Sequence, residues 1–284
     1  MNSGQIGIVM LWDALWLGLW LPAVYALCYS VYGHRWSAKI RCTLGMFCLA
    51  GMLASLILHR LPLPETPVFA VTSWDQATQW LVLAWAVCSG GILTRFAIRS
   101  FALFRHMRSL PKSRWDTGEL PVIKVSQQAQ SPFLAGWLRP TIVLTEALEA
   151  GDRSTVNPVI FHEMAHFQRR DHWALLAQRG LQSLFFFHPG VRWLSRQVSI
   201  ERELACDDYV LRDGHIGCRQ YAAALLALEA PVGPTNVLAF GEDEATGSRA
   251  LRVLVGEKRT KASLASWLLG CLSIVIIAVV GLSG

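Results

Sequence analysis

Four long apolar segments dominate the pattern of hydrophobic and polar positions along the chain. They cover about residues 6–30, 40–58, 78–96 and 263–282 and are rich in Leu, Val, Ile, Ala or Trp. Since a helix of about 20 apolar residues crosses the hydrocarbon core of a bilayer, each segment is long enough to be a transmembrane helix. Hydrophobic residues make up 53% of the chain, which is unusual for a soluble enzyme of this size. The pattern therefore predicts an α-helical membrane protein with four transmembrane helices.

Between the third and fourth apolar segments, the apolar residues occur in shorter runs that alternate with polar residues. Two β-branched runs, at 121–125 and 141–144, predict a short β element. It is either an edge on which a substrate chain could lie by strand addition or a structural hairpin. Apolar residues at helical spacing then predict helices at about 156–168, 173–187 and 191–212. A break is expected at His188-Pro189-Gly190.

These patterns divide the chain into three parts. We predict three transmembrane helices within residues 1–99, a compact α+β domain at 100–258, and the fourth transmembrane helix within 259–284.

Charge adds an orientation to this arrangement. The formal net charge is +6, and the basic residues gather at the edges of the apolar segments: His34, Arg35, Lys39 and Arg41 in the first loop, Arg95, Arg99, Arg105, Arg108, Lys112 and Arg114 after the third segment, and Lys258, Arg259 and Lys261 before the fourth. Because loops rich in Lys and Arg stay in the cytoplasm, the α+β domain is expected to be cytoplasmic. This placement explains the basic excess without direct nucleic-acid binding. The seven cysteines show no disulfide framework, which agrees with a reducing compartment.

The sequence His162-Glu163-Met164-Ala165-His166 is the main candidate for chemistry. Residues four apart share a helix face, so His162 and His166 can hold one metal ion together. Glu163 then lies beside the water that such a metal activates, where it can act as general base. This arrangement is typical of zinc peptidases.

A third protein ligand has two candidates. His172 has the spacing of the metzincin peptidases, but Arg169 stands where that layout needs glycine, and no methionine follows Met164. Glu203 lies on a predicted helix, four residues before Asp207, which could accept a hydrogen bond from a ligand histidine.

Two neighbours of Glu203 bear on this choice. Glu201, two residues earlier, points in a very different direction, so only one of the two glutamates can face the metal. Cys206 lies near the same face, and a cysteine ligand would suit a closed structural zinc site. Two histidines and one glutamate would instead leave a position open for water.

Together these residues resemble the membrane zinc peptidases of the BlaR/MecR type, the antibiotic-sensing signal transducers of bacteria. The resemblance is carried by His162-Glu163-Met164-Ala165-His166, Arg169-Arg170-Asp171-His172, His188-Pro189, Glu203-Leu204-Ala205-Cys206-Asp207, Ser131-Pro132-Phe133, Gly136 and Arg139-Pro140-Thr141-Ile142-Val143-Leu144. It extends over nearly the whole chain, including three spans, a cytoplasmic domain and a fourth span.

The resemblance implies a gluzincin-like site with Zn²⁺ as cofactor. His162, His166 and Glu203 would be the metal ligands, Glu163 the general base and Asp207 a carboxylate behind the ligands. It also implies a multi-pass location in the bacterial inner membrane. Transducers of this type continue into an external penicillin-binding sensor, which we do not expect in a chain of 284 residues. A stimulus would then arrive through the spans, the short external loops or a sensor partner protein.

The expected function is site-specific cleavage of a cytoplasmic regulatory protein, such as a transcriptional repressor, and of the chain itself near residues 249–261. Two alternatives remain open: a protease that clears damaged membrane proteins, and a zinc-bound signalling scaffold that does not cut. The expected partners are the protein substrate and membrane lipid, and a homodimer is compatible with the sequence. The donor for the negative tetrahedral oxygen is left unassigned among Tyr209, Arg212 and His188.

Overall fold

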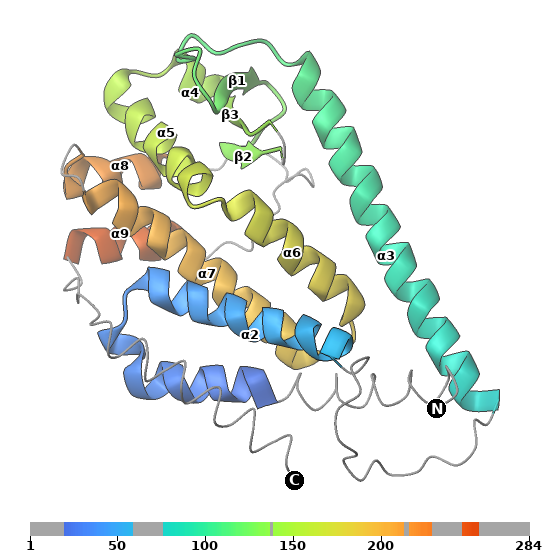
Figure 1. Ribbon diagram of the computed structural model, residues 1–284. Coiled ribbons are helices and arrows are strands. Elements are labelled where there is room, and N and C mark those ends of the chain that lie inside the picture. Colours follow the sequence, from blue (N-terminus) through green and yellow to red (C-terminus); the bar gives the residue numbers. More distant parts are fainter. Residues whose placement is uncertain (1–19, 59–75, 137–138, 213–215, 229–245, 256–284) are drawn as a thin grey trace. The chain divides into compact units, whose positions relative to one another are not determined.

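The computed structural model describes residues 20–58, 76–136, 139–212, 216–228 and 246–255. It is mostly helical, with one small sheet, as the sequence predicts (Figure 1). The described residues form two packed units, and each is considered by itself. The first contains residues 20–58, 76–96 and 177–198, and the second contains residues 97–136, 139–176, 199–212, 216–228 and 246–255.

The first unit is built from helices alone. A helix through residues 20–32 leads by a 3-10 turn, η1 (Gly33–Arg35), into α2 (Ala38–Leu58). The unit also holds the first part of α3 (Gln76–Ser109), the end of α6 (Asp171–Leu184) and the start of α7 (Pro189–Arg212). Its core comprises Leu21, Val24, Tyr25, Cys28, Trp36, Cys42, Leu44, Cys48, Leu49, Met52, Leu181, Phe185, Val191, Leu194 and Val198.

Helices α2 and α7 approach one another closely at Gly45. A Cβ atom built on Gly45 would lie 2.4 Å from Cγ2 of Val198, nearer than real side chains allow. The Cys42 thiol donates to the carbonyl oxygen of Val198 from 3.8 Å, three residues away on the same side of α2. The missing side chain of Gly45 therefore permits the two helices to pack.

Among the described residues, the stretch Gln79–Ser109 of α3 is long and apolar enough to cross a membrane, with a mean hydropathy of 1.8. Its large side chains are mostly exposed, including Trp80 at 67% and Leu81 at 68%. Such an exposed apolar surface suits contact with lipid. The helix continues past residue 96, where the predicted span ends, because no helix breaker occurs before Pro111 and arginine is a good helix former.

The other predicted spans have mixed outcomes. The second coincides with α2, while the fourth and residues 6–19 of the first lie outside the described residues. The number of transmembrane helices therefore stays a prediction. Residues 177–198, which the sequence assigned to the compact domain, pack within the first unit.

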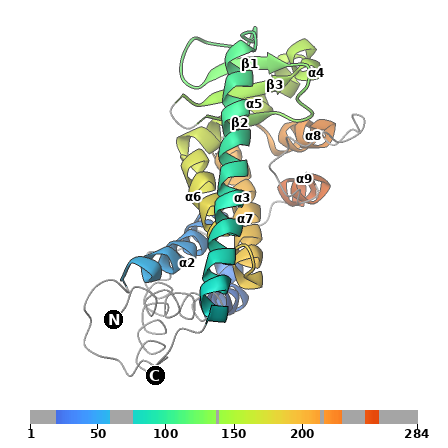
Figure 2. The ribbon, with the colours of Figure 1, turned by 90° about the vertical axis from the view of Figure 1, so that its right-hand side faces the viewer.

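The second unit contains a three-stranded sheet: β1 (Val122–Ser126), β2 (Phe133–Ala135) and β3 (Thr141–Thr145). The hairpin alternative is wrong, because β1 and β3 pair in parallel, with Val122 opposite Thr141. The strand order is β1-β3-β2, so β3 is central and β2 pairs with it in antiparallel fashion (Figure 2). The connection between the two runs is long enough to contain β2, which reverses the chain and frees β1 and β3 to run in the same direction.

Helices pack on this sheet and against one another. The chain continues from β3 through α4 (Glu146–Ala150) into α5 (Arg153–Gln168). The core that joins the sheet to these helices comprises Ile123, Ile142, Leu144, Leu148, Val156, Val159 and Ala224. A second cluster joins α8 (Cys218–Leu228) and α9 (Thr246–Val255), which lie side by side in Figures 1 and 2.

The predicted helices at 156–168, 173–187 and 191–212 correspond to α5, α6 and α7 within two to three residues at most ends. The break before α7 lies where it was expected, but Pro189 is the first residue of the new helix. Proline suits this position because its nitrogen has no hydrogen to leave unpaired. His188 is a turn residue whose Nδ1 accepts the backbone N–H of Gly190 from 3.1 Å.

Candidate metal centre

Helix α5 carries the two histidines of the candidate site. His162 and His166 lie one turn apart on the same face, and their rings meet edge to face with centroids 4.9 Å apart. Their side chains are only 11% and 14% exposed. Because Val156 and Val159 of the same helix belong to the core with the sheet, the backbone that bears the histidines is firmly held.

Helix α7 brings a carboxylate to the same place. Oε2 of Glu203 lies 3.4 Å from Nε2 of His162, and Oε1 lies 3.6 Å from Nε2 of His166. The three donor atoms lie close enough together to hold one metal ion. Glu201 is 99% buried and is not part of this group. The structure therefore brings together His162, His166 and Glu203, which the sequence named as ligands.

His172, the alternative third ligand, lies elsewhere. Its ring stacks on Phe167, with centroids 6.5 Å apart and an interplanar angle of 14°. It lines a surface pocket with Phe167, Gln168, Arg170 and Trp173. In the described part of the chain, neither cluster of potential metal ligands includes His172, so the geometry does not support the metzincin layout.

A hydrogen-bonded chain lies behind His162. Its Nδ1 lies 2.8 Å from the hydroxyl of Tyr221, which donates to Oδ1 of Asp207 from 2.6 Å. Nδ1 also lies 3.4 Å from the same Asp207 oxygen. Such contacts favour a proton on Nδ1 and leave the Nε2 lone pair facing Glu203, as a metal ligand requires.

His166 has a carboxylate of its own. Its Nδ1 lies 2.9 Å from Oδ2 of Asp171, the first residue of α6. Arg170, which has a left-handed φ of 60°, turns the chain between the two helices and lets Asp171 reach back. Each candidate ligand histidine therefore has Glu203 at one ring nitrogen and an aspartate at the other.

Cys206 lies behind His166, away from the nitrogen that faces Glu203. Its Sγ is 3.3 Å from Nδ1 of His166 and 3.5 Å from Oδ2 of Asp171. Burial and the negative charge of Asp171 raise the pKa of this thiol well above its usual value. Cys206 groups with His166 and Asp171 and not with His162 and Glu203, so the geometry favours the open set of two histidines and one glutamate over a closed site that adds Cys206 to it.

The site attracts positive charge. Burial alone would lower the pKa of His162, but hydrogen bonds with Asp207 and Glu203 outweigh it and raise this pKa to about 9. Burial acts to raise the pKa values of Glu203 and Asp207, yet the imidazoles and the guanidinium of Arg249 hold both well below the usual range. Both carboxylates are therefore ionised at neutral pH.

Glu163 lies beside His162 on α5 and is only 6% exposed. Among the described residues, it forms no hydrogen bond or ion pair with another side chain. An uncommitted carboxylate next to the ligand set is available to accept a proton.

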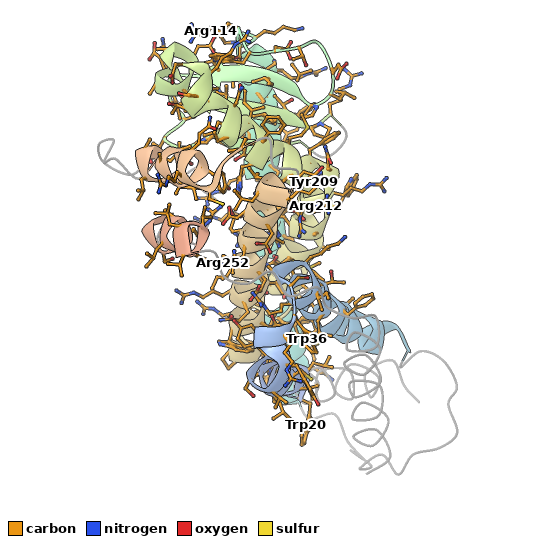
Figure 3. All side chains as sticks on the ribbon, turned by 90° about the vertical axis from the view of Figure 1, so that its left-hand side faces the viewer. Trp20, Trp36, Arg114, Tyr209, Arg212 and Arg252 are labelled. Atoms are coloured by element: carbon orange, nitrogen blue, oxygen red, sulfur yellow. The ribbon has the colours of Figure 1, made fainter. Side chains whose placement is uncertain are left out.

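The three candidates for the oxyanion donor have these contacts in the described residues. The Tyr209 hydroxyl donates to Oε1 of Gln168, and the guanidinium of Arg212 lies 5.1 Å from the centre of the Tyr209 ring. Figure 3 shows Tyr209 and Arg212 beside one another on the ribbon. His188 belongs to the first unit, where it contacts the start of α7.

Three residues at the site were not assigned to it from the sequence: Asp171, Tyr221 and Arg249. Asp171 had a local signal, because it follows the histidine helix directly. Tyr221 is 59 residues from His162 and Arg249 is 87 residues away, so no spacing rule could reach them. Arg249 lies on α9 and contacts both Asp207 and Glu203.

The donor set fits a catalytic metal. Two imidazole nitrogens and one carboxylate form the set that catalytic zinc sites use when they keep a position for water. Carboxylates that contact the outer nitrogens, here from Asp171 and Asp207, usually accompany such ligands. The arrangement therefore suits hydrolysis assisted by a metal ion.

Comparison with known proteins agrees with this picture. The model of the BlaR1 peptidase M56 family matches residues 7–253. The chain is also similar to the Regulatory protein BlaR1 of Bacillus licheniformis, at 29% identity over 91 residues. That similarity spans 32% of this chain and 15% of the relative. Since the family model extends over most of the chain and includes every residue of the candidate centre, the protein belongs to the BlaR1 peptidase M56 family.

Proposed function

We propose that this protein is an integral membrane zinc endopeptidase that cleaves a cytoplasmic regulatory protein. One observation carries the proposal: Nε2 of His162 and of His166 face the two oxygens of Glu203, at 3.4 and 3.6 Å. Membership of a peptidase family supports the reaction class. The exposed apolar surface of α3 supports the membrane location.

In this proposal His162, His166 and Glu203 hold the zinc ion. Bound there, zinc would polarise the scissile carbonyl and acidify the attacking water. Glu163 would accept a proton from the attacking water and would later pass it to the leaving amine. Asp171 and Asp207 keep the imidazoles in the orientation and tautomer that this chemistry needs.

The sheet offers a place for the substrate chain. Among the described residues, β2 is an edge strand, with β3 on one side only, and it packs against the histidine helix α5. An extended peptide can join such an edge through main-chain hydrogen bonds. This mode of binding would present a peptide bond near α5 with little demand on side-chain sequence.

The nature of the substrate is inferred from the relative. The protein of Bacillus licheniformis is named a regulatory protein, and we propose that the present chain likewise acts on a regulator, such as a repressor. A cytoplasmic position of the second unit would give it access to such a protein, and basic residues at the end of α3 favour that position.

The test is a comparison of new protein N-termini in cells that express the natural chain or Glu163→Gln at matched levels. Glutamine keeps the size of the side chain but cannot accept the proton, so we expect a loss of at least about 100-fold in cleavage. New ends that occur only with the natural chain would identify the substrate directly.

The pattern of ends separates the alternatives. Ends in one or a few soluble regulators support the proposal, whereas ends in many unrelated membrane proteins would indicate clearance of damaged proteins. Identical ends with both chains, under a stimulus that activates signalling, would argue for a scaffold that does not cut. Ends within residues 249–261 of the chain itself would establish self-cleavage; residues 249–255 lie in helix α9, which must unwind first, and 256–261 lie outside the described residues.

A further inference from the structure

We propose that Arg249 is a positioning residue of the metal centre, through which helix α9 sets the orientation of Glu203 and His162. The inference rests on the metal centre proposed above and adds a residue that controls it. Arg249 comes from a segment far along the chain from the histidine helix, and its side chain is only 11% exposed.

The guanidinium of Arg249 donates two hydrogen bonds to the carboxylate of Asp207. Nε donates to Oδ2 from 3.0 Å and Nη2 donates to Oδ1 from 2.6 Å. Two parallel bonds of this kind fix both the position and the plane of a carboxylate. Oδ1 of Asp207 also accepts a hydrogen bond from the hydroxyl of Tyr221, which lies 2.8 Å from Nδ1 of His162. The position of Asp207 therefore affects the orientation of the His162 ring.

The same guanidinium contacts the other side of the centre. Nη1 lies 3.2 Å from Oε2 of Glu203, and Nη2 lies 3.4 Å from Nε2 of His162. Glu203 and Asp207 lie four residues apart on α7, where two negative charges repel one another. Arg249 contacts both carboxylates and compensates their charges. It therefore holds Glu203, the proposed third ligand, and Asp207, which contacts His162.

Helix α9 is itself held beside the centre. Ala250 and Val253 of α9 are buried against Tyr221, Ala222 and Leu225 of α8. Tyr221 therefore joins the apolar cluster through its ring and the hydrogen-bonded chain through its hydroxyl. The packing of α8 and α9 determines where Arg249 reaches the ligands.

Arg252 provides a matched control on the same helix. It donates to Oδ1 of Asp208 from 3.0 Å and to the Leu204 carbonyl oxygen from 3.5 Å. In the part of the chain that the structure describes, no contact joins Asp208 to the histidines of the centre. Arg252→Lys therefore alters two contacts of α9 with α7, to Asp208 and to Leu204, neither of which is a proposed ligand.

The experiment measures Co²⁺ binding to the full chain in detergent, for the natural protein, Arg249→Lys and Arg252→Lys. Lysine keeps the positive charge, so repulsion of the metal is unchanged, but it cannot form two parallel bonds with Asp207. We expect Arg249→Lys to raise the dissociation constant of Co²⁺ by about 10 to 100-fold and to shift its visible absorption bands. Arg252→Lys should stay within about twofold of the natural protein, with unchanged bands.

Each other outcome overturns the assignment. Equal weakening in both variants would mean that Arg249 merely docks α9, and an unchanged constant and spectrum in Arg249→Lys would mean that it does not position the ligands. If the natural chain binds no Co²⁺, the metal centre of the proposed function is overturned as well. The band positions are read only on protein that has bound the metal, so partial misfolding of a variant does not imitate the effect.

Discussion

The two histidines of the candidate centre each have a carboxylate on both sides of the ring. Asp207 and Asp171 approach the Nδ1 atoms, and Glu203 faces both Nε2 atoms. This arrangement favours a positive charge between the rings, whether the charge is a proton or a metal ion. Protons and metal ions should therefore compete for His162.

At the residue scale, we predict that the metal-free protein loses stability as the pH rises and that a bound metal ion offsets this loss. The pKa of His162 is about 9 in the folded chain, above its ordinary 6.5, so the protonated form stabilises the fold fully below pH 6.5 and this contribution is lost as the pH rises through 9. In the presence of a chelator, the free energy of unfolding should fall by up to about 3 kcal/mol between pH 6.5 and 9.5. The measurement is the midpoint of thermal unfolding at the two pH values.

His162→Gln is the control for this prediction, because glutamine does not titrate. The variant should lose most of the pH dependence, and added Zn²⁺ should stabilise the natural chain more at pH 9.5 than at pH 6.5. An equal pH dependence in both proteins would show that another group is responsible.

At the element scale, the helices were easier to predict than the sheet. The period of apolar residues is a local property, so α5, α6 and α7 followed from it, although α7 begins at Pro189, two residues before the predicted start at 191. The pairing of β1 with β3 was not visible in the sequence, because strand direction depends on where the intervening chain, including β2, goes.

The contact of α2 with α7 leads to a prediction about Gly45. Gly45→Ala should lower the midpoint of thermal unfolding in detergent, by an amount equivalent to about 1–3 kcal/mol, because the new methyl group meets the stiff side chain of Val198. Gly90→Ala on α3 is the matched control. Apart from the neighbouring backbone of its own helix, no atom of the described residues lies within 4 Å of the added Cβ, so the higher helix propensity of alanine should leave stability unchanged or raised. Equal effects of both substitutions would contradict the close packing at Gly45.

At the scale of the whole molecule, the orientation in the membrane decides which proteins the centre can meet. The basic residues at the end of α3, which include His106 and Arg108, favour a cytoplasmic position for the residues that follow. The described chain offers a direct probe of this orientation. Cys218 at the start of α8 is exposed, whereas Cys206 in the same unit is buried.

We predict that Cys218 reacts with a membrane-impermeant maleimide in inside-out vesicles and is protected in intact cells. The readout is the mass of the labelled protein, and Cys218→Ser identifies the signal that belongs to this thiol. Labelling of Cys218 in intact cells would place the second unit outside and would rule out a cytoplasmic substrate.

The sequence by itself determined those features that depend on residues close together in the chain. Two histidines four residues apart share one face of a helix, and a long apolar run has the composition of a membrane span, so the histidine pair of α5 and the length and apolarity of α3 needed no further information. Only the tertiary structure decided that Glu203, rather than His172, faces the histidines, and that Arg249 completes their surroundings. Such contacts join residues tens of positions apart, and they exist only once the packing of the helices has placed the side chains within hydrogen-bonding distance.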